Sequence, residues 1–395
     1  MSATDRIFDP KLAFLAVTAI AVSQYAVFVL ALAGASPDFT FGGDFAAFWV
    51  AAKATLNGSM AELYQADLFK EAIQAQTPHE ELEGLTWQYP PHAGLLFAPI
   101  GALPFHIAYA VWCALGLAFY IAAAQSAGFK DRLLIVLIAS IPVLLALKTG
   151  QVGLLMGGLL LLAVFHAGSR PILAGIAAGL LTMKPQLGFL LPVLFIAGGH
   201  WRAFYAASVV SLALILGSVG WLGIDVWSAF FDSVLSVSDS VATGEMPLYK
   251  MVNIYAATQM LGLPDAVALS FAFAGILLAA GAMTWVARRT ENPEWHYAAI
   301  AGLTLIAAPY SYYYELVLIV PALLFALKRG HEFGWLRFER ESVALAVFIC
   351  LAIPGPAIRS GVSINFFLML LVCAVLYRRL SAELGTKSPS ALHPA

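Results

Sequence analysis

Residues 105–127 read FHIAYAVWCALGLAFYIAAAQSA, a run of 23 residues that contains no Asp, Glu, Lys or Arg. A helix needs about 20 predominantly apolar residues to cross the hydrocarbon core of a bilayer. The run therefore predicts a transmembrane helix, and it places the chain among integral membrane proteins.

Composition supports this class over the whole chain. Hydrophobic residues make up 61% of the 395 positions, and the mean hydropathy is +0.84, whereas soluble domains contain about 45–50% apolar residues. Lys and Arg number 21 against 23 Asp and Glu, so the chain lacks the basic surface that a nucleic-acid partner would need. The three cysteines, Cys113, Cys350 and Cys373, lie in apolar runs and predict neither a disulfide framework nor a metal site.

The length criterion predicts an all-α, multi-pass protein in which a single domain covers residues 1–395. The first apolar run is longer than the core of a signal peptide, so we interpret it as an uncleaved span. The twelve expected spans are residues 12–34, 105–127, 132–147, 151–168, 171–183, 186–199, 203–222, 264–287, 295–309, 314–328, 342–354 and 361–377.

The distribution of Lys and Arg predicts the orientation, because these residues accumulate on the cytoplasmic side. With a cytoplasmic N-terminus, fifteen of them fall on that side and six on the other. The tail, 378–395, is then cytoplasmic, and two long loops, 35–104 and 223–263, lie outside. Segment 91–104 is expected to be re-entrant or to lie on the surface, because its glycines and prolines make it a poor helix. If it crosses, the later spans reverse.

Two short helices are expected in the first outer loop. Apolar residues recur between positions 45 and 56 at the spacing of one helical face, and we predict that this helix lies on the membrane surface. A second helix, over residues 63–73, has an acidic polar face. Apolar burial, rather than attraction to anionic lipid, would hold that second helix at the membrane.

Polar residues within or beside a membrane are costly, so they indicate functional sites. Six polar clusters that are far apart in the sequence all fall on the predicted outer side: residue 44 and segments 87–92, 148–151, 184–186, 250–253 and 310–315. We therefore expect one site on that side. Its candidate residues are Asp44, Tyr89, His92, Lys148, Gln151, Lys184, Gln186, Asn253, Tyr313 and Glu315.

Asp44 has two compatible interpretations. It can be the N-cap of a helix that starts at Phe45, because Asp is a preferred N-cap residue and Gly42-Gly43 would supply the turn. It can also be a functional carboxylate, since it is an isolated acid beside an aromatic segment in a chain that is only 11% charged.

Structural roles are equally open for several other candidates. Lys148 and Lys184 could anchor span ends by reaching toward the membrane surface, and His92 could be a hydrogen-bonded structural residue. The tyrosine-rich segment 310–314 could be an interfacial aromatic belt. Glu315 could be an acid in the first turn of a helix.

Together the candidates indicate a chemistry of group transfer. A carboxylate can accept a proton from an attacking hydroxyl, and ammonium and amide donors can hold the charge that grows on a departing phosphate. No HExxH, GxSxG, Walker or GxGxxG motif occurs in a supporting context, which disfavours the corresponding hydrolases, kinases and dehydrogenases. We expect no cofactor and no metal site.

The order of several short motifs resembles glycosyltransferase family 87, over about residues 38–330. The motifs are Gly43-Asp44-Phe45, Tyr89-Pro-Pro91, Gly150-Gln151, Lys184-Pro185 and an aromatic segment around Pro309. The resemblance implies a GT-C fold and a polyprenyl-phosphate-linked sugar donor. It also implies a lipid or glycan acceptor, and an active site on the extracytoplasmic side of a bacterial plasma membrane.

The same resemblance implies roles for particular residues. Asp44 matches the catalytic acid of the family's first outer loop, and Lys148, Gln151, Lys184 and Gln186 become candidates for the donor phosphate or the cavity wall. Mycobacterial mannosyltransferases of the family carry histidine where this chain has tyrosines in segment 310–314, which leaves the sugar and the acceptor open.

The mechanism expected from these roles is a metal-independent, inverting transfer with Asp44 as general base. Two other functions remain open from the sequence: a transporter of polyprenyl-linked sugars or lipids, and a non-catalytic subunit of an envelope-polysaccharide assembly. Transporters typically bind at the membrane midplane between repeats, whereas the polar clusters here lie at one face and no inverted repeat is evident.

Overall fold

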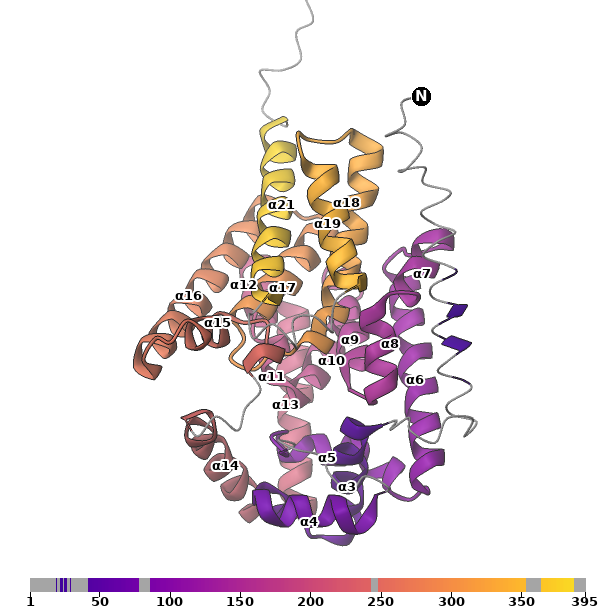
Figure 1. Ribbon diagram of the computed structural model, residues 1–395, viewed down its shortest axis with the longest axis vertical. Coiled ribbons are helices and arrows are strands. Elements are labelled where there is room, and N and C mark those ends of the chain that lie inside the picture. Colours follow the sequence, from indigo (N-terminus) through magenta and orange to yellow (C-terminus); the bar gives the residue numbers. More distant parts are fainter. Residues whose placement is uncertain are drawn as a thin grey trace, which may run out of the picture.

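A computed structural model describes residues 42–77, 86–242, 248–352 and 364–386, together with a few single positions between residues 19 and 29. These residues form helices and no strand; a single isolated antiparallel bridge joins Met251 and Tyr312. The predicted all-α class is therefore confirmed for this part of the chain. In Figure 1, α18 (Ile319–Phe333), α19 (Glu339–Ala352) and α21 (Ile364–Thr386) gather at the upper end, and α3 (Gly43–Asn57), α4 (Ala66–Gln76) and α5 (Pro91–Gly101) at the lower end.

Within the described ranges, three helices are long and apolar enough to cross a membrane: α6 (Phe105–Ser126), α13 (Trp201–Leu222) and α16 (Asp265–Arg289). A fourth candidate is the pair α7 (Asp131–Ile138) and α8 (Ile141–Thr149), which is bent by 46°. The chain is a membrane protein. The other predicted spans fall on shorter, broken or more polar helices, and most of span 12–34 lies outside the described residues. The number of twelve spans and the position of the N-terminus thus stay predictions.

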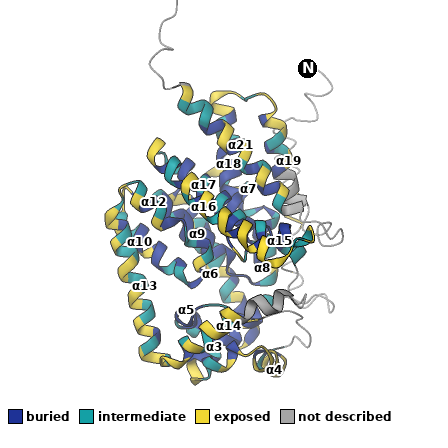
Figure 2. Cartoon of the chain, turned by 90° about the vertical axis from the view of Figure 1, so that its left-hand side faces the viewer, coloured by how far each residue is buried: buried dark blue, intermediate teal, exposed yellow. Residues whose placement is uncertain are grey.

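The centre of the molecule is α9 (Gly153–Phe165). Helix α9 is apolar on every side, as is typical of a helix surrounded by protein or lipid, and it packs against α6, α10 (Pro171–Leu180) and α17 (Pro293–Ala307). Figure 2 shows α9 as mostly buried, whereas α13 carries exposed residues along its length.

Aromatic hydroxyls fix the 3₁₀ helix η4 (Tyr313–Leu318) to this centre. Tyr120 Oη donates to the Val317 carbonyl at 3.1 Å, and Tyr297 Oη donates to the Leu318 carbonyl at 2.9 Å. The end of η4 is therefore held from the core side, while its first residues, Tyr313 and Tyr314, form a wall of the candidate site.

The structure corrects the predicted setting of the first loop helix. Phe45, Phe48 and Trp49 of α3 are buried against protein, and the small residues on the other faces are buried as well, so the helix does not lie on a membrane surface. A Cβ at Gly101 of α5 would lie only 2.6 Å from the Ala52 backbone, which shows how closely α5 covers α3. Of the predicted apolar face, only Leu56 is exposed.

The second loop helix has the predicted pattern. It consists of η1 (Met60–Tyr64) and α4, with Phe69 and Ile73 buried and Asp67 and Glu71 exposed. The expectation that segment 91–104 makes a poor helix is wrong, because its first 11 residues form α5. Pro91 occupies the start of α5, where the missing amide proton costs no intrahelical hydrogen bond.

Glycines of α10 allow this helix to pack closely against α13. We predict that Gly175→Ala destabilises the protein by about 1–3 kcal/mol, the usual range for overpacking. The added Cβ would lie 2.4 Å from Ala206 Cβ and 2.6 Å from the Ala203 carbonyl oxygen. Gly220→Ala in α13 is the matched control, since its Cβ would meet nothing within 4 Å. Thermal unfolding of both variants tests this; equal midpoints would contradict it.

Candidate active site

A cavity of about 240 Å³ lies where the starts of α3 and α9 meet the segments around Lys184, Lys250 and η4. Six separate stretches of the chain form its wall. The lining residues are Asp44, Ala47, Phe48, Thr86, Trp87, Gln88, Tyr89, Thr149, Gln151, Met183, Lys184, Gln186, Lys250, Tyr310, Tyr312, Tyr313 and Tyr314.

Asp44 reaches this cavity from the first turn of α3. The N-cap of α3 is Gly42, whose φ of 68° favours glycine, and no side chain caps this end of the helix. The prediction that Asp44 is the N-cap is therefore wrong. Because its carboxylate is not used for capping, it is available to the cavity, where it is half-buried.

The C-terminal end of α8 holds the start of α3 in place. Gly42 N donates to the Lys148 carbonyl at 3.1 Å, and Trp112 Nε1 donates to the Gly150 carbonyl at 2.9 Å. Gly150 has a φ of 71°, and a Cβ there would lie 2.4 Å from Phe45 Cβ. A glycine is thus required next to Asp44, both by backbone conformation and by space.

The surroundings of Asp44 act on its protonation in opposite directions. Burial raises the pKa of the Asp44 carboxyl above its ordinary value, while a hydrogen bond from the Gln151 side chain and the charges of Lys250 and Lys184 lower it. Burial prevails, so the pKa is raised. A raised pKa makes a carboxylate a stronger base than an ordinary aspartate.

Lys184 forms a buried ion pair with Glu315; its ammonium also lies 5.5 Å from the centre of the Tyr89 ring and 5.4 Å from that of Tyr314. Burial alone would lower the pKa of Lys184, but the neighbouring Glu315 carboxylate raises it above its ordinary value. Glu315 Oε2 also accepts a hydrogen bond from Tyr312 N at 3.1 Å, in the first turn of η4. The expectation that Glu315 is a helix N-terminal acid is confirmed.

Lys250 comes into the cavity through a short backbone contact. Its neighbour Met251 forms the antiparallel bridge to Tyr312, and Val252 N donates to the Ser311 carbonyl at 2.9 Å. Lys250 is half-buried, and no carboxylate of the described residues forms an ion pair with it. Lys250 therefore differs from Lys184 in that no close ion pair neutralises its charge within the described part of the chain, although this charge acts on Asp44 across the cavity.

Six of the ten predicted site residues line the cavity: Asp44, Tyr89, Gln151, Lys184, Gln186 and Tyr313. Glu315 lies behind this wall as the partner of Lys184. The lining of the cavity does not include Lys148, His92 or Asn253.

The three residues outside the lining have other surroundings. Lys148 has an exposed side chain. His92 Nε2 lies 3.2 Å from Thr182 Oγ1, and its ring stacks on Trp227 at 5.9 Å between centres. Asn253 caps α15 (Ile254–Met260) by accepting from Ala256 N at 2.8 Å, and it donates to the Pro309 carbonyl at 2.9 Å. The structural interpretation of His92 fits these contacts.

Sequence reasoning placed Lys250, Thr149 and Tyr312 in polar clusters but did not select them as site residues. Lys250 is placed by the isolated bridge between Met251 and Tyr312. This contact is too short to produce the alternating pattern by which a strand is recognised in a sequence. Among the described residues, no three His, Cys, Asp or Glu side chains lie close enough together to hold a metal ion.

The family model of glycosyltransferase family 87 matches residues 87–309, which is more than half of the chain. The chain belongs to glycosyltransferase family 87. No curated protein and no solved structure gives a match. Family 87 membership makes this membrane protein a glycosyltransferase, and sugar donor and acceptor are its substrates.

The family 87 match also limits what can be transferred by similarity. It contains Tyr89, Gln151, Lys184 and Lys250, but Asp44 and segment 310–314 lie beyond its ends. Asp44 is connected to the matched region through the cavity, because its carboxylate lines the same cavity as Gln151, Lys184 and Lys250.

Proposed function

We propose that this protein transfers a hexose from a polyprenyl-phosphate carrier to a hydroxyl of a lipid or glycan acceptor, with Asp44 as general base. The observation that carries this proposal is one cavity that combines a carboxylate of raised pKa with Lys250, a cation that forms no ion pair with the described residues, in a chain of glycosyltransferase family 87. The EC class that corresponds to this activity is 2.4.1.

The proposed reaction is a single displacement with inversion. Asp44 takes the proton of the acceptor hydroxyl, and the hydroxyl oxygen forms the new bond to the anomeric carbon. The bond between that carbon and the phosphate oxygen breaks on the opposite face, and the polyprenyl phosphate leaves with the electron pair. The Gln151 amide, which donates a hydrogen bond to Asp44, holds the carboxylate in one orientation for this step.

Lys250 is the residue we assign to the donor phosphate. A positive charge placed where negative charge develops stabilises the transition state, and Lys184 is already neutralised by Glu315. Lys148 lies outside the cavity lining. Gln186 and Tyr313 add hydrogen-bonding groups to the wall, and the rings of Phe48 and Tyr89 offer apolar faces to a sugar.

The distribution of charge supports the membrane setting that we propose. We place the cavity on the extracytoplasmic side of a bacterial plasma membrane, because Lys and Arg accumulate on the cytoplasmic side. Helices α18 and α21, which carry Arg329 and Arg379, lie in the upper half of Figure 1, away from α3 at the lower end. A lipid-linked sugar donor suits a site on that side of the membrane, since the transfer then needs no nucleotide-linked sugar outside the cell.

Mass-spectrometric comparison of envelope glycolipids and glycans from cells with and without this protein tests the proposed function. We expect a sugar-bearing species to disappear and the acceptor that lacks this sugar to accumulate. Restoration of that species by the Asp44→Asn variant would contradict the proposed role of Asp44. Loss of lipid transport between leaflets without any missing glycosidic bond would instead indicate a transporter.

Lys250→Gln is expected to lower kcat/KM for the lipid-linked donor by about 10²- to 10³-fold, the range found when a group that stabilises developing charge is removed. The matched control is Lys148→Gln, which removes a lysine outside the cavity and should stay within about twofold of the wild type. Initial rates measured against donor concentration distinguish the two. Equal loss in both variants would contradict the assignment of Lys250.

A further inference from the structure

An apolar groove that shares no lining residue with the candidate active site lies between α16, α17 and α21. Its volume is about 530 Å³, which falls within the usual range of about 300–1,000 Å³ for ligand sites. Leu278 and Ala282 of α16, Ala299 of α17 and Leu380 of α21 are among the residues that line it. The α16 residues belong to the C-terminal half of that helix, the half that ends at Arg288 and Arg289.

Aromatic and basic side chains stand together at one edge of this groove. Trp285 and Tyr377 both line it, and their ring centres are 5.9 Å apart. The Arg289 guanidinium lies over the Trp285 ring, 5.9 Å from its centre. Trp and Tyr are enriched at the level of lipid headgroups, so this edge has the composition of a membrane interface.

The positive charge at this edge is not neutralised by neighbouring acids. Arg288 and Arg289 are exposed, and neither forms an ion pair with any residue of the described ranges. Basic residues beside a membrane attract anionic lipids, and basic pockets between transmembrane helices bind their headgroups.

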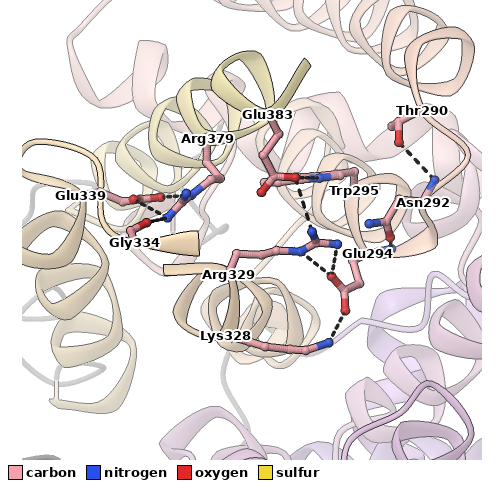
Figure 3. A network of polar contacts seen from close by, with 10 residues as sticks. All are labelled: Thr290, Asn292, Glu294, Trp295, Lys328, Arg329, Gly334, Glu339, Arg379 and Glu383. Atoms are coloured by element: carbon pink, nitrogen blue, oxygen red, sulfur yellow. Dashed lines mark hydrogen bonds and ion pairs between the residues drawn. The ribbon is translucent and has the colours of Figure 1, made fainter. Parts of the chain in front are cut away.

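The two arginines drawn with Trp295 in Figure 3 differ from Arg288 and Arg289, because each of them is paired with a carboxylate. Arg329 pairs with Glu294 at 2.8 Å and with Glu383 at 3.5 Å, while Arg379 pairs with Glu339 at 2.7 Å. Because carboxylates already neutralise these two guanidinium groups, they offer no free charge to an anion. The contrast assigns headgroup binding to the exposed end of α16.

We propose that this groove binds an anionic phospholipid from the leaflet beside Arg288 and Arg289. An acyl chain would lie along the apolar wall, and the phosphate of the headgroup would contact Arg289 next to Trp285. This inference rests on the groove and its charged edge, not on sugar transfer, so it stands or fails independently of the proposed function.

Native mass spectrometry of the purified full-length protein tests this inference. Phosphatidylglycerol and phosphatidylcholine with the same acyl chains are titrated in parallel, and we expect phosphatidylglycerol to be retained at least fivefold more tightly. Arg289→Gln should weaken phosphatidylglycerol binding by about fivefold, the effect of one basic residue near a membrane surface. Arg202→Gln, which changes an exposed arginine at the start of α13, should leave binding unchanged.

A second variant tests the apolar part of the site. Gly281 lines the groove, and a Cβ there would meet nothing within 4 Å, so Gly281→Leu is expected to fold and to fill the space for the chain. It should weaken binding of both lipids. Equal retention of the two lipids, unchanged binding by Arg289→Gln or Gly281→Leu, or displacement of the lipid by millimolar inorganic phosphate would each overturn the proposal.

Discussion

Asp44→Asn is expected to reduce sugar transfer by about 10²- to 10⁴-fold, the contribution typical of a positioned general base. The asparagine keeps the shape of the side chain but cannot take the acceptor proton. Folding should be retained, because Asp44 does not cap α3. Initial rates with a lipid-linked donor, together with thermal unfolding of the same samples, provide the measurement.

Asp67→Asn is the matched control for this loss, since Asp67 lies on the exposed face of α4 and its variant should keep wild-type activity. The pH dependence gives a second readout. A base acts when deprotonated, and the pKa of Asp44 is raised by burial. The rate should therefore fall with decreasing pH at a value above about 3.9, the ordinary pKa of Asp. A rate that stays constant down to that pH would argue against Asp44 as the base.

Glu315→Gln is expected to destabilise the protein by about 3–5 kcal/mol, because it leaves the buried Lys184 ammonium without its carboxylate partner. The measurement is the shift in the thermal unfolding midpoint. The double variant Lys184→Met/Glu315→Gln should recover much of this loss, since no isolated charge then remains buried.

Lys328→Met is the matched control for the buried pair. Lys328 pairs with Glu294 at 2.8 Å, but its side chain is 39% exposed, and exposed pairs contribute only about 0–1 kcal/mol. If Glu315→Gln shifted the midpoint no more than Lys328→Met does, Lys184 would not depend on Glu315. Lys184 would then be available to the donor phosphate, and the assignment of that role to Lys250 would lose its basis.

The sequence could predict the long apolar helices, but it could not predict whether a given helix face contacts lipid or protein. Residues 105–127 form α6 almost as expected, because its length and lack of charge leave few alternatives. The helix over residues 45–56 was predicted at nearly its observed bounds, but hydropathy does not distinguish a lipid-facing side chain from one that faces protein. Phe45, for example, was expected to face the membrane but packs on Phe105 and Tyr109 inside the molecule.

The candidate site shows the same division. We predicted one site for Asp44, Gln151 and Lys184 because all three fall on the same predicted side of the membrane, and they line one cavity. Clusters on one side of a membrane protein have a limited area in which to meet. The predicted side of the membrane could not decide between Lys148 and Lys250, because the direction in which each side chain points depends on tertiary packing. It also could not pair Lys184 with Glu315, a contact between distant segments that only the folded chain brings together.

Sugar transfer by the purified full-length protein in lipid nanodiscs tests the central claim most directly, with polyprenyl-phosphate-linked and nucleotide-linked sugars supplied in parallel. We predict a new glycosidic product from the lipid-linked donor alone, with an inverted anomeric configuration, and at most a trace of it from Asp44→Asn. Product from the nucleotide-linked donor alone, or wild-type yield from folded Asp44→Asn, would contradict the account.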